Sequence, residues 1–167
     1  MGKPLYDTDF YAWIQEQVRL LSTRQFEALD LDHLIEEVDS LARQQHLLLH
    51  HRLETLLTHL VAWWGTIPER CIRWEGSIAA QRYELQDLLA DSPSLAVDVA
   101  PQVLRDAWAV VRQRSAETWP VADFPPDCPW SLAELMDEDF FPTDDTFVAR
   151  QQEAPDAVND ALDPDRR

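Results

Sequence analysis

The sequence predicts an all-α fold, and three observations lead to that prediction. The 167 residues include only three glycines, too few for a turn-rich sandwich or for the glycine loops of nucleotide-binding folds. Apolar residues recur at helical spacing in several segments. A hydrophobic fraction of 46% with seven tryptophans indicates a packed core. We therefore predict one domain over residues 1–142, a four-helix-type bundle with one long central helix, a proline-rich C-terminal strap and a short fifth helix.

The longest predicted helix runs from Leu31 to Trp64 and contains all five histidines. At about 100° per residue, one broad arc of this helix is apolar. The arc consists of Leu34, Ile35, Val38, Leu41, Ala42, Leu48, Leu49, Leu53, Leu56, Leu60 and Trp63. Asp30 and Asp32 provide a cap signal before the helix, and Gly65 ends it. A break near Gln44–Gln45 is compatible with its unusual length.

Shorter elements precede and follow the central helix. They are helices over Tyr6–Leu21 and Glu75–Leu89, a helix with Pro101 in its first turn, an extended strap over Trp119–Trp130 and a short helix ending near Met136. On the first helix, one face carries Phe10, Trp13, Ile14 and Leu21. Ser131 and Glu134 form a capping-box pattern for the last helix. Residues 143–167 are acidic and poor in apolar clusters, so we expect a disordered tail.

The formal net charge of −17 favours a protein that stays in solution and disfavours nucleic acid and anionic membranes as partners. No signal-peptide pattern and no apolar run of membrane length occur in the sequence. Cys71 and Cys128 are far apart and do not form a metal-type pair. We therefore expect a cytoplasmic protein with reduced thiols, no cofactor and no membrane contact.

The first candidate site is a polar row within the apolar arc. Gln45, Arg52 and His59 interrupt the arc at heptad spacing, and such side chains need partners in an apolar seam. With Glu37, and with Arg82 from a neighbouring helix, they form a candidate network. Two interpretations stay open. The network fixes the helix register, or its arginine, histidine and carboxylate bind an anion or perform acid–base chemistry.

The second candidate site is a basic and aromatic patch of Arg70, Arg73 and Trp74. Positive charge beside an aromatic ring can hold phosphate or single-stranded nucleic acid. The alternative is that the aromatic ring packs in the bundle while the arginines lie along it. Cys71 lies between the two arginines, which can lower the pKa of a thiol, but an ordinary thiol is the simpler interpretation.

Metal and hydrolase chemistry receive little support from the sequence. His46, His50 and Glu54 have ligand-like spacing, but they move away from the apolar arc towards solvent. The Glu-x-x-His pattern of di-iron bundles does not occur. No nucleophile-elbow pattern indicates a serine or cysteine hydrolase. We therefore predict no metal site.

Several motifs follow one another over about residues 5–142. They are Tyr6-Asp7-x-Asp9-Phe10-Tyr11-x-Trp13, Leu29-Asp30-Leu31-x-x-Leu34-Ile35-Glu36-Glu37, Arg52-Leu53, Leu56-Leu57-x-His59-Leu60, Trp63, Trp74, Ile78, Gln81-Arg82, Asp91-Ser92-Pro93-Ser94-Leu95 and Cys128-Pro129-Trp130-Ser131-Leu132. In this order they resemble a bacterial family catalogued as domain of unknown function 29. The resemblance implies an all-helical fold and no established activity.

The sequence thus favours a non-enzymatic interaction or regulatory module that binds a protein partner or associates with itself. The alternative is an enzyme, or an anion- or phosphate-binding protein, that uses a semi-buried seam of Arg52, His59 and a carboxylate. A solvent-open pocket at these residues would favour the alternative, and a dry, fully paired seam would favour the module.

Overall fold

The computed structural model describes residues 5–65, 72–118 and 124–143. Within these ranges every regular element is a helix and no strand occurs, which confirms the all-α class. The long helix α3 (Leu31–Gly65) continues through Gln44–Gln45 without a break. Apart from Thr143, the predicted disordered tail lies outside the described residues. Contacts divide the chain into two compact units, Met1–Gln45 and His46–Arg167, and each is described separately.

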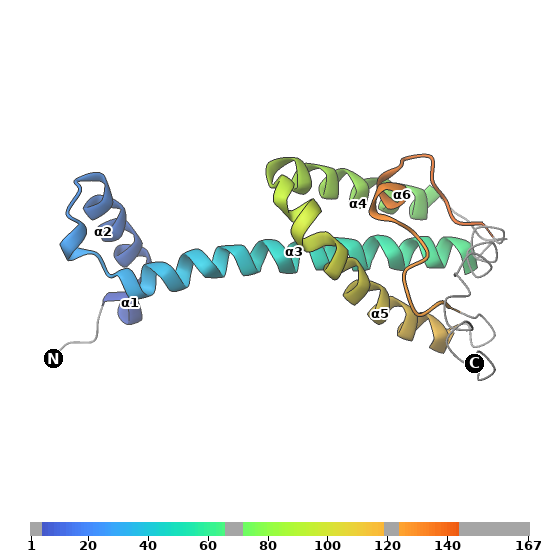
Figure 1. The fold of residues 1–167 in the computed structure, drawn as a ribbon, viewed down its shortest axis with the longest axis horizontal. Coiled ribbons are helices and arrows are strands. Elements are labelled where there is room, and N and C mark those ends of the chain that lie inside the picture. Colours follow the sequence, from blue (N-terminus) through green and yellow to red (C-terminus); the bar gives the residue numbers. More distant parts are fainter. Residues whose placement is uncertain (1–4, 66–71, 119–123, 144–167) are drawn as a thin grey trace, which may run out of the picture. The chain divides into compact units, whose positions relative to one another are not determined.

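The first unit contains α1 (Leu5–Thr8), α2 (Phe10–Ser22), the 3-10 turn η1 (Phe26–Ala28) and the first part of α3, drawn in the blue colours of Figure 1. The single helix predicted for this region is interrupted at Asp9. The Asp9 backbone is not helical (φ −152°, ψ 84°), and its carboxylate accepts a hydrogen bond of 3.0 Å from the N–H of Ala12. Asp9 is therefore the N-cap of α2.

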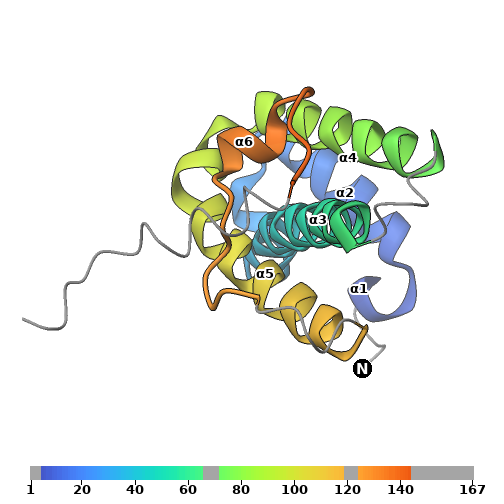
Figure 2. The ribbon, with the colours of Figure 1, turned by 90° about the vertical axis from the view of Figure 1, so that its right-hand side faces the viewer.

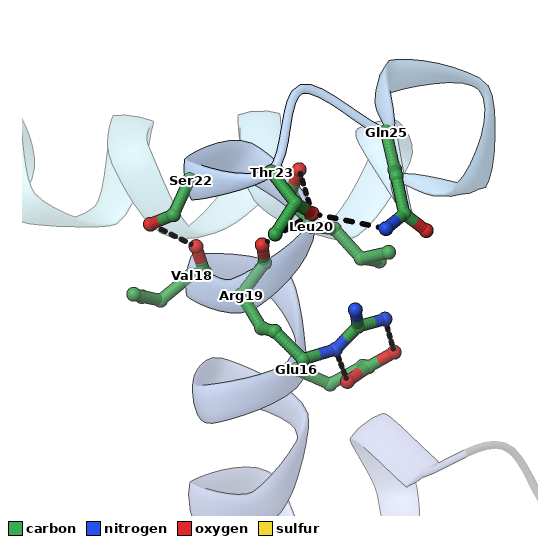
Figure 3. Close-up of polar contacts among 7 residues, drawn as sticks. All are labelled: Glu16, Val18, Arg19, Leu20, Ser22, Thr23 and Gln25. Carbon is green, nitrogen blue, oxygen red and sulfur yellow. Dashed lines mark hydrogen bonds and ion pairs between the residues drawn. The ribbon is translucent and has the colours of Figure 1, made fainter.

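The C-terminal end of α2 is closed by side chains, whose contacts Figure 3 shows, and by backbone hydrogen bonds. The hydroxyls of Ser22 and Thr23 donate to carbonyl oxygens one turn earlier. Arg24 has a φ of 57°, and the N–H of Gln25 donates to the carbonyl of Leu20 at 2.9 Å. This is a Schellman motif in which arginine occupies the left-handed position that glycine usually fills.

The second unit contains the remainder of α3, α4 (Ile72–Asp91), the π-helical turn η3 (Leu95–Val99), α5 (Ala100–Thr118) and α6 (Leu132–Met136). Helices α4 and α5 lie on either side of α3, and α6 lies beside α4 (Figures 1 and 2). The predicted capping box is present, because the Ser131 hydroxyl accepts from the Glu134 N–H while Glu134 binds the Ser131 N–H. Residues 124–130 of the predicted strap contain no helix.

The second unit has an extensive hydrophobic core. Its fully or almost fully buried members include Leu49, Leu53, Leu56, Leu57, Leu60, Val61, Ile78, Leu85, Val103, Ala107, Trp108, Val111, Trp130 and Leu135. Each large side chain buried in this way contributes about 1.5–3 kcal/mol. Trp108 Nε1 also donates to the carbonyl of Pro125 at 3.0 Å, which attaches the strap to α5.

Candidate functional site

Arg82 is a buried arginine on α4, with only 2% of its surface exposed. Its guanidinium donates to the backbone carbonyls of Leu135 at 2.8 Å, Glu138 at 3.0 Å and Phe140 at 2.5 Å. The ring of Phe141 lies 5.3 Å from its central carbon. These contacts attach α6 and the residues after it to α4. The N–H donors of the guanidinium are therefore bound to backbone carbonyls of this chain.

Arg52 and His59 lie on the second part of α3 and have different surroundings. Arg52 donates to Gln81 at 3.4 Å and to Glu84 at 3.2 Å, near the surface. The ring of His59 lies 5.3 Å from that of Trp74. Its Nδ1 is buried and has no hydrogen-bond partner among the described residues. Burial lowers the pKa of His59, so the ring is neutral at pH 7.

Glu37 and Gln45 belong to the first unit. Glu37 accepts a hydrogen bond of 2.6 Å from the hydroxyl of Tyr6, which raises the pKa of Tyr6 to about 12. Gln45 is exposed. The five residues predicted as one network therefore have different surroundings, and Glu37, Arg52 and Arg82 each bind a different group. Heptad spacing could not reveal this, because Arg82 binds carbonyls that lie more than fifty residues further along the chain.

The predicted anion patch is only partly described. Arg70 and Cys71 lie outside the described residues, and Arg73 belongs to the first turn of α4. Trp74 packs against the hydrophobic core.

The contacts of His46, His50 and Glu54, the three residues with ligand-like spacing, are as follows. Glu54 forms an ion pair with Arg114 and lies 3.7 Å from Nδ1 of His50, while His46 is exposed. No group of three or more metal-ligating side chains is found in the described part of the chain.

The first unit contains an apolar groove that the sequence prediction did not identify. The groove has a volume of about 330 Å³ and lies between α2 and the first part of α3. It is lined by Phe10, Trp13, Ile14, Gln17, Val18, Leu21, Leu34, Glu37, Val38, Leu41 and Gln44. Both rows of apolar side chains were visible as helical faces in the sequence. The spacing does not show whether a second layer covers such a face.

In the first part of α3 the apolar face is largely exposed. Ile35, Val38 and Leu41 are 67%, 65% and 61% exposed, and Phe10 and Val18 on α2 are about half exposed. All of them except Ile35 line the groove. Ile35 lies three residues before Val38, on the same face of α3. The apolar arc of α3 is thus a core only in its second part.

A polar cluster lies where α2 meets the start of α3. Trp13 Nε1 donates to Asp30 Oδ2 at 3.1 Å, and His33 Nδ1 lies 2.8 Å from the same oxygen. Tyr6 stacks on His33 with ring centres 3.8 Å apart. The bond to Asp30 raises the pKa of His33, and the same bond lowers the pKa of Asp30. This cluster holds the two helices in the arrangement that forms the groove.

The fold and these sites define an all-α protein with one well-packed unit and one helical hairpin that carries an apolar groove. No helix in the described ranges combines the length and apolarity needed to cross a membrane. A family model described as "Domain of unknown function DUF29" matches residues 5–141, so the chain belongs to that family. No curated protein and no solved structure matches the chain.

Proposed function

We propose that this protein is a protein-interaction module and that the groove between α2 and α3 is its binding surface. The observation that carries the proposal is the apolar surface formed by the groove, which includes the exposed Val38, and by the neighbouring exposed Ile35. Continuous exposed apolar surface is typical of protein-binding sites. A groove between two helices accepts the apolar face of a third helix.

The alternative function, anion binding or catalysis at the Arg52–His59 seam, has weaker support. The guanidinium of Arg52 is shared by Gln81 and Glu84, and that of Arg82 is occupied by backbone carbonyls. His59 is neutral and adds no positive charge. The contacts of these residues favour a structural role.

A selection with displayed peptides tests the proposal. A library of designed amphipathic helices is panned against the full-length protein, and the selected peptides are then measured against Val38→Glu. We expect at least a tenfold loss of affinity, because a carboxylate in the groove must be desolvated on binding. The control Val97→Glu changes a residue of η3 that is 76% exposed, and should keep the affinity. Equal binding to all three proteins would contradict the proposal.

A further inference from the structure

We infer that the groove is occupied by a second copy of this chain, with two hairpins packed about a two-fold axis. Helix α2 and the first part of α3 from each copy would then form one four-helix bundle. The inference rests on the proposed function, because it names the partner that the same groove accepts.

The first argument is the small core of the hairpin. Among residues 5–45 only Trp13, Gln17 and Leu20 are buried, and one of these three is polar. A segment of this size rarely sustains a core without a staple or association with another chain. A pair of helices buries its apolar side only when another layer covers it.

The second argument is that both helices of the hairpin carry exposed apolar side chains. These are Phe10, Val18 and Leu21 on α2, and Leu31, Ile35, Val38 and Leu41 on α3. Because a two-fold axis brings the same patch of each copy together, each hairpin would cover the other. If a partner covered all of these residues completely, it would bury at most on the order of 700 Å² per copy, compared with roughly 800 Å² for each partner in a standard interface.

The third argument is the position of the charges. At about 100° per residue, Glu36 lies on the side of α3 opposite to Val38. Asp32 and Asp39 lie beside Ile35, at the edge of the exposed apolar surface. The carboxylate that lines the groove belongs to Glu37, and it is bound by Tyr6. The middle of the apolar surface, around Val38, therefore offers few charges to a basic partner. Two copies of an acidic chain can pack through this middle region while the carboxylates of Asp32 and Asp39 stay at the rim in water.

Sedimentation equilibrium of the full-length protein gives the first test. We expect twice the chain mass of 19.3 kDa at micromolar concentration, and at least tenfold weaker association for the double variant Val38→Glu/Leu41→Glu. The control Val97→Glu should associate like the original protein. Far-UV circular dichroism establishes that the variants are folded. A protein that stays monomeric at high micromolar concentration would overturn the inference.

Photo-crosslinking in the producing cells gives the second test and needs no destabilising substitution. p-Benzoylphenylalanine replaces Ile35, and in the control it replaces Val97. We expect a covalent dimer from the first position alone, with the crosslink within residues 5–45 of the other copy.

The outcomes of this experiment separate the inference from the proposed function. A crosslink to residues 46–167 of another copy would overturn the two-fold pairing of hairpins. A crosslink to a different protein would overturn the inference and leave the proposed function in place. A surface that crosslinks to no protein would overturn both.

Discussion

The two parts of α3 carry the same apolar pattern but differ in burial. Leu49, Leu53 and Leu56 are fully buried in the second part, whereas Ile35, Val38 and Leu41 in the first part are mainly exposed. The difference comes from their neighbours. The second part has α4 and α5 on either side (Figure 2), whereas the first part has the short α2. The spacing of apolar residues therefore predicts that a helix face is covered, but it does not identify the helices or the partner that cover it.

Matched leucine substitutions test this comparison directly and give the largest expected effect. Leu56→Ala creates a cavity in the core and should lower the free energy of unfolding by about 2–5 kcal/mol at any protein concentration. Leu41→Ala should cost less than about 1 kcal/mol in the monomer. If two copies pair, the Leu41 variant loses more at high concentration. Chemical denaturation at two concentrations a hundredfold apart measures both. An equal loss of unfolding free energy in the Leu56 and Leu41 variants at low protein concentration would contradict the difference in burial.

The next largest effect on stability is expected from two matched substitutions, one at the buried Arg82 and one at Arg52 near the surface. Arg82→Met removes the donor of three hydrogen bonds to the Leu135, Glu138 and Phe140 carbonyls. Each buried carbonyl left unpaired is costly, so we expect a loss of about 2–4 kcal/mol. Arg52→Met removes a surface pair and should cost about 0–1 kcal/mol. Urea unfolding followed by tryptophan fluorescence compares the variants. A similar cost for both would contradict the structural role of Arg82.

Two histidines on α3 should make the two parts respond to pH in opposite directions. Asp30 raises the pKa of His33, so the stability that this contact adds is complete below the unfolded value of about 6.5 and is lost as pH rises through the folded pKa. Burial lowers the pKa of His59, so its neutral ring favours folding above about 6.5, and that stability is lost as pH falls towards the folded pKa.

Titration of the ring protons by NMR measures both pKa values in the folded protein. We expect His33 to titrate above, and His59 below, an unfolded histidine. Amide exchange, corrected for the intrinsic pH dependence, should show the first part of α3 gaining protection on acidification while the second part loses it. Asp30→Asn should remove the shift at His33 alone. Identical titration of the two rings would contradict the prediction.

The sequence predicted the features that local chemistry determines. It placed α3 almost to the residue, from its acidic cap to Gly65, and it identified the capping box of Ser131 and Glu134. The interruption at Asp9 was missed, because an N-cap within an amphipathic segment resembles an acidic first turn.

The candidate sites depended on contacts that no local pattern encodes. The partners of Arg82 are backbone carbonyls, which carry no residue-type signal. The groove exists because α2 leaves side chains such as Val38 exposed. Periodicity showed the two apolar faces of the groove, and only the arrangement of the helices showed that they are open.

The smallest expected effect concerns the turn that closes the hairpin. Arg24 has a left-handed backbone, with a φ of 57°, which costs about 1–2 kcal/mol for a residue with a Cβ. Arg24→Gly removes that cost but adds conformational freedom to the unfolded chain, so a net gain of about 0.5–1 kcal/mol is expected. This gain in stability should be confined to the first unit, which contains Arg24. Amide exchange should therefore slow in α2 and the first part of α3, while the amides around Trp108 in α5 stay unchanged. Arg24→Ala is the matched control, because it removes the same side chain and keeps the Cβ. A similar gain from alanine would show that the guanidinium, rather than the backbone, destabilises the turn.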